Sequence, residues 1–321
     1  MTHLVNHVLE NHHLQSDSTL HVVGVVSNPA RWNSRYRIAR EWIKAMEETK
    51  NVKLYVAETA YGDRFHEIVE TGNPNHLPLR SRSEVWLKEA MINLGVRDLL
   101  PRNWKYVSWI DMDVFFRDPN WAIETIHHLQ HFHVVQPWSQ CVDLGPVGNI
   151  LSTFNSMGYL QQAGIKIQQN PSEPYPYGHS GFAWAATREF WEQSGGLMSF
   201  PLLGSSDHHM AWSFLGDVDS TIHGGMSESF FRRCREWQSK VLRLTNKQIG
   251  YVPGRIEHQW HGNKKKRFYR ERWQILVDHN FDPDTDIMID AQGLPTLINK
   301  PELEHAIHKY NLSRLEDGID E

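Results

Sequence analysis

Short apolar runs alternate with segments of helical periodicity from Leu20 to Gln136. The first run, LHVVGVV, is continuous and fits a buried strand, and from Asn33 onward apolar residues recur at spacings of three and four, as in a helix. The same alternation continues with strands at 52–57, 105–110 and 133–136 and helices at about 85–100 and 120–131. Strands and helices in this order predict an α/β fold with an open, mostly parallel, twisted sheet flanked by helices.

Two long stretches lack this periodicity. Residues 59–79 contain several glycines and prolines and are predicted to form a polar loop, and residues 137–178 are predicted to be irregular for the same reason. Between them, Ser81 and Glu84 have the spacing of a capping box, which predicts the start of a helix that continues to about Leu100.

The remainder of the chain predicts shorter elements. Residues 179–186 and 250–257 fit strands, and Thr187 is placed to cap a helix that stops at Gly195. Further helices are predicted in three places: from the glycine-led turn at Gly204 to Leu215, over 227–243 and over 301–310. The last residues are acidic and polar, and we expect them to fray.

Composition narrows the class of protein. A chain of 321 residues with 40% hydrophobic and 22% charged residues is typical of a globular protein with a large core. Its 33 basic and 38 acidic residues give a net charge of −5, so no overall positive field attracts nucleic acid or acidic lipid. Only two cysteines and no apolar run near the roughly 20 residues of a membrane span predict a cytoplasmic, unanchored protein.

The most informative stretch is WKYVSWIDMDVFFRDP, at 104–119. Its apolar run is followed by two carboxylates, Asp111 and Asp113. On an extended chain these side chains point to the same side, and their Cα atoms are about 7 Å apart. Two such acids repel each other and are hard to desolvate unless a cation joins them, and Mg²⁺ or Mn²⁺ suits oxygen ligands. The alternative is that both carboxylates are solvated where the strand meets a loop.

Cations follow the first strand. Ser27 and Asn28 end it, and Arg31, Arg35 and Arg37 lie in the turn and the first residues of the helix that follows. Several cations beside a helix N-terminus at the carboxyl end of a strand suit phosphate groups. The alternative is the solvated face of a surface helix.

A second basic cluster comes late in the chain. His258 and His261 are three residues apart, so either is placed to add a nitrogen ligand to an ion held by the earlier acids. The run that follows is strongly basic: Lys264, Lys265, Lys266, Arg267, Arg270 and Arg272. Such a run is commonly a solvated helix face, but joined to a metal site it fits a clamp for a diphosphate.

Candidate residues for the acceptor side lie between these clusters. Asp207, in the polar turn after Gly204, is placed either to cap a helix or to act as a general base on a hydroxyl group. Four other side chains fit a binding surface for a sugar or a base, although core packing is the alternative: His179, Trp184, His208 and Trp212.

Taken together, these features resemble the GT-A type of nucleotide-sugar glycosyltransferase. The resemblance covers about 20–276 and rests on four segments in order: VVSNPARWNSRYR, the D-x-D at 109–113, GSSDHHMAW and WHGNKKKRFYR. It implies that Asp111 and Asp113 hold Mn²⁺ or Mg²⁺ on the donor diphosphate. It also implies that His261, which Gly262 follows, completes the coordination of the ion. It also implies Asp207 as the base of an inverting sugar transfer, although the acid that often precedes this base is here Ser206.

The resemblance further implies a division of the chain. Residues 1–19 are expected to be a flexible tail, 20–280 a catalytic domain with a nucleotide-sugar half up to 137, and 281–321 an extension. The expected donor is a nucleoside diphosphate sugar, with a UDP-sugar favoured. The expected acceptor is a hydroxyl of a glycan, a protein or a hydroxylated DNA base, which must be flipped out of a duplex to react. Neither the oligomeric state nor the sugar follows from the sequence.

Two other classes fit parts of the sequence. A hydrophobic strand followed by Asp-x-Asp also opens haloacid-dehalogenase-like phosphatases, in which the first Asp is the nucleophile. Those enzymes place it on the first strand and need a later acidic pair, for which the acids at 217 and 219 are a poor substitute. The basic run at 264–272 also fits a nucleic-acid-binding protein, which the net charge of −5 disfavours as the whole function.

Overall fold

The computed structural model describes residues 18–167, 178–268 and 271–318, and these form a mixed α/β fold. Its main sheet has the strand order β3-β2-β1-β4-β10-β6-β11, and β10 is antiparallel to both of its neighbours while the other described pairs are parallel. The strands are β1 (Leu20–Ser27), β2 (Val52–Tyr61), β3 (His76–Ser81), β4 (Tyr106–Ile110), β6 (Val134–Gln136), β10 (Ala183–Thr187) and β11 (Gly250–Tyr251). The prediction of an open, mostly parallel sheet is confirmed.

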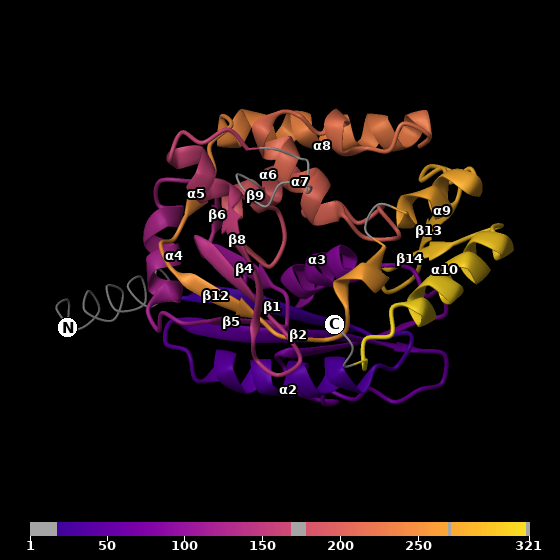
Figure 1. The fold of residues 1–321 in the computed structure, drawn as a ribbon, viewed down its shortest axis with the longest axis horizontal. Helices are drawn as coiled ribbons and strands as arrows, with labels where there is room; N and C mark the ends of the chain where they lie inside the picture. The colour runs from indigo at the N-terminus through magenta and orange to yellow at the C-terminus, as the bar shows by residue number, and fades with distance from the viewer. Residues whose placement is uncertain (1–17, 168–177, 269–270, 319–321) are drawn as a thin grey trace, which may run out of the picture.

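Helices cover both faces of this sheet (Figure 1). Successive residues of a strand point to opposite faces, so Val22 packs in the cluster that includes Trp42 and Val23 in the one that includes Met91. The first face carries α2 (Asn33–Glu47) and α4 (Trp121–Leu129), and the second carries α3 (Lys88–Leu99), α6 (Arg188–Ser194), α7 (Ser206–Leu215) and α8 (Glu228–Thr245). None of the helices that the structure describes has the length and apolar character to cross a bilayer.

A second sheet, of order β5-β12-β7-β8-β9, lies beside the carboxyl end of β4. It consists of β5 (Val114–Phe116), β12 (Arg255–His258), β7 (Gln140–Leu144), β8 (Ile150–Ser156) and β9 (Gly178–His179), and α5 (Met157–Gln162) follows β8. In its register, His258 lies opposite Val114 of β5 and opposite Asp143 of β7. The pairing therefore brings segments that are far apart in the sequence to the end of the D-x-D strand.

The C-terminal part of the chain folds beside α3 and then returns to α2 (Figure 1). It comprises α9 (Arg272–Asp278), β13 (Ile287–Ile289), β14 (Pro295–Leu297) and α10 (Pro301–Ser313), and two short 3₁₀ helices, η1 (Asp219–Thr221) and η2 (Lys264–Arg267), precede it. The expected fraying is wrong for the described residues that follow α10, because the Glu316 side chain is buried and Asp317 accepts hydrogen bonds from the backbone N–H groups of Asn33 and Ser34, at 2.9 and 2.7 Å.

Two predictions before α3 are wrong. Residues 59–79 are not one loop, because β2 runs on to Tyr61 and β3 pairs with it in parallel. β3 is an edge strand, and an edge strand tolerates a proline such as Pro78. In the sequence this proline indicates a loop, so the strand was not predicted. The capping box is also absent, because Ser81 ends β3 and donates to the Ser83 carbonyl (2.8 Å), while α3 begins at Lys88 without a side-chain cap.

Two further predictions are corrected in the second half. The stretch 137–178 contains β7, β8 and α5, although its prolines at Pro171, Pro174 and Pro176 lie outside the described residues. The strand predicted over 179–186 is two strands, β9 and β10, which belong to different sheets and are separated at Phe182 with φ of 78°. The strand predicted over 250–257 divides in the same way into β11 and β12.

The helix signals of the second half are confirmed. The Thr187 hydroxyl accepts from the N–H of Phe190 (3.2 Å) at the start of α6, and Gly195 ends that helix in the left-handed region, with φ of 78°. α7 follows the turn after Gly204 and ends at Leu215, as predicted. α8 and α10 lie within a few residues of their predicted bounds.

Close packing of β1 against α2 gives a test of the fold. A Cβ at Gly24 would lie 2.6 Å from Cζ3 of Trp42, whose side chain is fully buried, so Gly24→Ala forces the ring or the strand to shift. We predict a loss of about 1–3 kcal/mol in the free energy of unfolding, measured by urea denaturation. Gly254→Ala is the control, because no atom lies within 4 Å of a Cβ there. Equal stability of the two variants would contradict this packing.

Candidate active site

A cleft of about 760 Å³ opens beyond the carboxyl ends of β1 and β4. Its lining comes from the β1–α2 turn, the residues after β4, the first turns of α3 and α7, the segment after β12 and the C-terminal residues. Ligands of open α/β sheets bind at this edge, and the volume lies within the range of small-molecule sites. The fold therefore brings most of the predicted chemistry to one place.

Three side chains in the cleft form a group with the spacing of a metal site: Asp113, His258 and His261. Their nearest ligand atoms all lie within 4.8 Å of one another. Oδ2 of Asp113 is 2.8 Å from Nε2 of His261 and 3.6 Å from Nε2 of His258. Both predicted histidines thus belong to this group, whereas the resemblance favoured His261 as the metal ligand.

A carboxylate lies behind each histidine. Oδ1 of Asp143 is 2.6 Å from Nδ1 of His258, and Oε2 of Glu316 is 3.3 Å from Nδ1 of His261. A proton on each Nδ1 would satisfy these two carboxylates, which only accept, and would leave each Nε2 available to a cation beside Asp113. Histidine ligands of metal ions are commonly oriented in this way.

The electrostatics of the group favour a positive charge at its centre. Although burial opposes its ionisation, His258 and His261 hold the pKa of Asp113 well below its usual range. Burial likewise opposes a charge on His258, but Asp113 and Asp143 raise its pKa above the usual value. Oδ1 of Asp113 is buried and has no hydrogen-bond partner among the described residues. A buried carboxylate oxygen without a partner is costly, and a bound cation would satisfy it. These residues fit a divalent metal ion.

Asp111, the other predicted metal ligand, has a different neighbour. Its carboxylate forms an ion pair with the ammonium group of Lys88, the first residue of α3. Burial raises the pKa of Asp111, with a further contribution from Asp113, while Lys88 opposes the rise. Asp111 lines the cleft but is not part of the compact group of three, and its role as a metal ligand stays a prediction.

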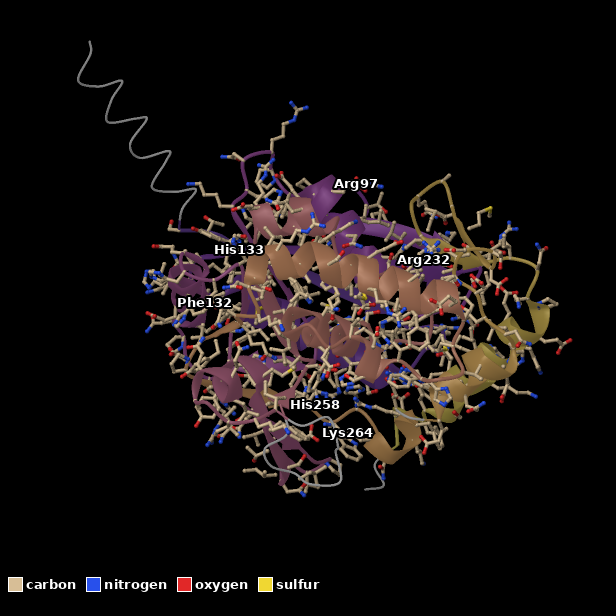
Figure 2. All side chains as sticks on the ribbon, turned by 90° about the horizontal axis from the view of Figure 1, so that it is seen from above. Arg97, Phe132, His133, Arg232, His258 and Lys264 are labelled. Carbon is tan, nitrogen blue, oxygen red and sulfur yellow. The ribbon has the colours of Figure 1, made fainter. Side chains whose placement is uncertain are left out.

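The late basic run points largely into the cleft. Nζ of Lys264 is 2.6 Å from Oδ2 of Asp143, and Nη2 of Arg267 is 2.8 Å from Nε2 of His261. Figure 2 shows Lys264 beside His258. Arg272 is buried at the start of α9 and contacts the hydroxyl of Ser205.

The remaining predicted basic residues of this run differ in position. Lys266 is partly exposed and does not line the cleft. Arg270 lies outside the described residues, and for Lys265 only the backbone, within η2, is described.

The predicted residues around the first turn divide into two sets. Ser27, Asn28 and Arg35 line the cleft, and Arg35 is held by the Glu316 carboxylate and by the Ser27 carbonyl, at 3.0 Å. Arg31 is exposed, and Arg37 pairs with Glu41 (3.0 Å) on the outer face of α2. Both side chains are therefore solvent-exposed and do not line the cleft, Arg31 in the turn and Arg37 on the helix.

Two carboxylates on the acceptor side have opposite pKa shifts. Although burial opposes it, Lys88 and His179 lower the pKa of Asp207, in the first turn of α7. Burial raises the pKa of Glu89, on α3, to about 7, and its Oε2 accepts from Nε1 of Trp86 (2.9 Å). Environments that shift the pKa values of two neighbouring acids in opposite directions are typical of acid–base sites.

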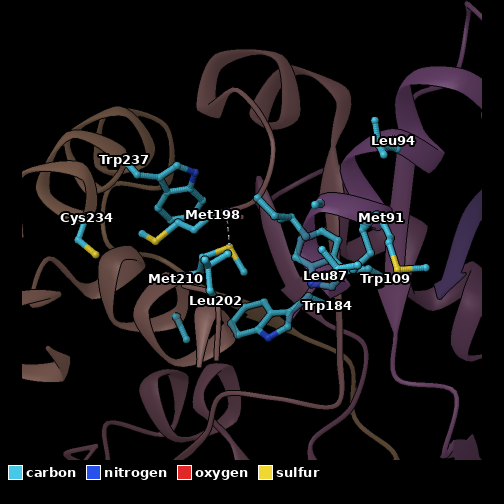
Figure 3. Close-up of a cluster of buried hydrophobic side chains, with 14 of the residues drawn as sticks. Leu87, Met91, Leu94, Trp109, Trp184, Met198, Leu202, Met210, Cys234 and Trp237 are labelled. Atoms are coloured by element: carbon cyan, nitrogen blue, oxygen red, sulfur yellow. Dashed lines mark hydrogen bonds between the residues drawn. The ribbon is translucent and has the colours of Figure 1, made fainter. Parts of the chain in front are cut away.

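The predicted acceptor-side aromatics also divide. His179 and His208 line the cleft, and burial lowers the pKa of both, that of His179 to about 3, so both are neutral at neutral pH. Trp184 and Trp212 are instead core residues, with 3% and 7% of their surfaces exposed. Figure 3 shows Trp184 inside the buried cluster. The structure supports packing for both tryptophans.

Sequence reasoning missed four charged residues at this site: Lys88, Glu89 and Glu316, which line the cleft, and Asp143, which contacts His258. Asp143 carried a weak local signal, because it is an acid beside the apolar residues of strand β7. The others lie in segments that look like ordinary amphipathic helix or polar tail.

Comparisons with known proteins find similarity only among solved structures. No protein-family model and no curated protein sequence matches the chain. A mutant of Drosophila β-1,4-galactosyltransferase 7, in complex with manganese, UDP-Gal and xylobiose, has a TM-score of 0.40 at 12% identity, over 90% of this chain and 98% of that one. A Pyrobaculum calidifontis mannosyltransferase in complex with GDP-Man and Mn²⁺ has a TM-score of 0.42 at 12% identity, over 92% of this chain and 72% of that one.

TarS from S. aureus has a TM-score of 0.42 at 8% identity, over 81% of this chain and 64% of that one. Likenesses with TM-scores below 0.5 do not assign a ligand or an activity, so the function of this chain is argued from its own site.

The raised pKa of Glu89 predicts a pH dependence of stability. Between the ordinary pKa of 4.5 and about 7, the native state keeps a proton that the unfolded state releases, so stability falls as the pH rises through this window. Glu89→Gln removes the effect. We expect wild type to lose about 2–3 kcal/mol more unfolding free energy than Glu89→Gln between about pH 5 and 8.

Chemical denaturation of both proteins at the two pH values measures this difference. Glu47→Gln, at an exposed position of α2, is the control and should follow wild type. Parallel pH profiles of wild type and Glu89→Gln would show that the Glu89 carboxyl is not perturbed.

Proposed function

We propose that this protein is a metal-dependent glycosyltransferase, which moves a sugar from a nucleoside diphosphate sugar to an acceptor hydroxyl. The observation that carries the proposal is the group of Asp113, His258 and His261 at the carboxyl edge of the sheet. Basic side chains for a diphosphate and a carboxylate for a hydroxyl share its cleft. The metal group, the basic side chains and the carboxylate each fit other roles when taken alone, but this reaction uses all three together.

The donor set of one carboxylate and two imidazoles helps to identify the ion that binds. Of the two ions predicted from the sequence, Mg²⁺ prefers oxygen ligands and retained waters, whereas Mn²⁺, a first-row transition metal, also binds mixed nitrogen and oxygen donor sets. We therefore favour Mn²⁺, held by Asp113, His258 and His261. When bound, such an ion neutralises negative charge on the phosphate oxygens of the donor.

The chain's own cations have a matching role. Lys264 contacts Asp143, which lies behind His258, and Arg267 contacts His261, so both lie where a diphosphate beside the metal group would meet them. As the bond between the anomeric carbon and the diphosphate breaks, negative charge grows on the leaving oxygen. Fixed ammonium and guanidinium groups stabilise that charge without reorganising.

Asp207 is the candidate general base. Its lowered pKa keeps it ionised at neutral pH, and it lines the cleft from the first turn of α7. A Cβ at Gly181 would lie 2.8 Å from its Oδ2, so glycine is required for the backbone to come this close. In the proposed step Asp207 takes the proton of the acceptor hydroxyl as the oxygen attacks the anomeric carbon. This single displacement would invert the configuration.

Glu89 fits a different role beside this base. Its pKa of about 7 lies nearer the ideal for acid–base catalysis, but its oxygen is hydrogen-bonded to Trp86, which lines the cleft. We assign Glu89 to holding the indole in place on the acceptor side. The acceptor itself is an unidentified hydroxyl compound, and glycans, proteins and hydroxylated DNA bases are the classes to test, with a UDP-sugar as the first donor.

The geometry gives no support to the two rival classes. Asp111 follows the fourth strand of the chain and pairs with Lys88, and Asp219 pairs with Arg235 (2.9 Å) on an exposed surface, so the two do not make a phosphatase site. Lys264, Arg267 and Arg272 line the cleft, whereas a nucleic-acid surface needs its cations directed outward.

A panel of nucleoside diphosphate sugars tests the proposal. A ligand at 100 times its Kd adds about 2.7 kcal/mol to stability, so the right donor should raise the thermal midpoint clearly in the presence of Mn²⁺. Asp113→Asn keeps the shape of the side chain but removes its charge, and we expect it to abolish the Mn²⁺-dependent shift. Asp207→Asn should keep the shift and lose about 10²–10⁴-fold in transfer rate.

Asp219→Asn, which removes only an exposed ion pair, is the control and should behave as wild type. A chain that no sugar nucleotide stabilises, with or without metal, is not this kind of transferase. Wild-type transfer by Asp113→Asn in excess Mn²⁺ would show that the metal group has been misassigned.

A further inference from the structure

The segment that follows α10 is built into the wall of the cleft. Oγ of Ser34 donates to the Glu316 carbonyl (3.0 Å), and Nε1 of Trp260 donates to the Gly318 carbonyl (3.0 Å). A Cβ at Gly262 would lie 2.7 Å from Cα of Glu316, so glycine, with φ of 87°, lets the two backbones meet. The backbone at Glu316 thus lies directly against Gly262, the residue after His261.

The carboxylate of Glu316 contacts three groups at once. It pairs with Arg35, whose Nη2 is 2.8 Å from Oε1, and with Arg314, whose Nε is 2.7 Å from Oε1. Its Oε2 faces Nδ1 of His261 at 3.3 Å. Only 1% of the Glu316 surface is exposed, so water does not compete for these contacts.

We propose that Glu316 is a positioning residue that orients His261 for metal binding. It accepts a hydrogen bond from the Nδ1–H group and so favours the ring orientation in which Nε2 binds the ion together with Asp113. Asp143 stands in the same relation to His258, from a different strand and at 2.6 Å. The proposal rests on the metal group of the proposed function and adds to it that the C-terminal segment completes the site.

A purely structural role is the alternative. Glu316 neutralises Arg35 and Arg314, so its removal leaves buried guanidinium groups and lowers stability whatever happens at His261. Stability alone therefore does not separate the two roles. Two other quantities do: the affinity for Mn²⁺ and the hydrogen bond made by the His261 Nδ1–H group in the metal-loaded protein.

The test measures both quantities on the full chain without any sugar nucleotide. We expect Glu316→Gln to bind Mn²⁺ about 10–100-fold more weakly by electron paramagnetic resonance titration. In the protein loaded with Zn²⁺, a diamagnetic substitute, the His261 Nδ1–H signal should show the downfield shift of a hydrogen bond to a carboxylate in wild type and lose that shift in the variant. Asp317→Asn is the matched control, because its side chain binds α2 rather than His261, and its affinity should stay within about twofold of wild type.

Each result bears on the proposal. Wild-type Mn²⁺ affinity in Glu316→Gln overturns it, and so does a loss of affinity with an unchanged Nδ1–H signal. If that variant does not fold, Glu316→Asp, which keeps the charge between the two arginines, takes its place with the same expectations. A wild-type chain that binds no Mn²⁺ overturns this inference and the metal site together. Mn²⁺ binding without any response to sugar nucleotides contradicts the proposed function alone.

Discussion

The site depends above all on strand β12, which lies between β5 and β7 in the second sheet. Its register sets His258 opposite Val114, the residue after Asp113, and the backbone N–H of Gln259 donates to the Asp113 carbonyl (2.8 Å). The same strand sets His258 opposite Asp143 on its other side. Because side chains alternate along a strand, a slip of one residue would turn His258 away from both acids. The metal group is therefore a consequence of strand pairing between distant segments.

Around that group, buried charge is balanced almost throughout. Asp111 has Lys88, Asp143 has Lys264, and Glu316 has Arg35 and Arg314. Asp113 has only imidazoles within contact range among the described residues, and one of its oxygens has no partner. Of the three acids next to the two histidines, Asp143 and Glu316 have Lys or Arg partners, whereas Asp113 has none among the described residues and faces the cleft. This contrast is the physical reason to place a divalent ion at Asp113.

The sequence predicted the elements whose signal is local. β1, α2, β4 and α6 carry their own periodicity or caps, and the D-x-D run, Asp207 and the basic run at 264–272 are visible as residue types in order. What it missed was created by tertiary contact. β3 and β7 are recognisable only from their partners, and Glu316 looks like part of a polar tail until it meets His261. Charge alone also misled, since Arg31 and Arg37 are as basic as Arg35 but face solvent.

The central claim is that two histidines and one aspartate hold the ion. Electron spin-echo spectroscopy of bound Mn²⁺ tests it most directly, with the full chain grown on ¹⁴N- or ¹⁵N-labelled histidine. The account predicts modulation from two imidazole nitrogens that changes with the isotope, and from one nitrogen in either His258→Ala or His261→Ala. Bound Mn²⁺ whose spectrum is the same with both isotopes, and therefore has no histidine ligand, would contradict it.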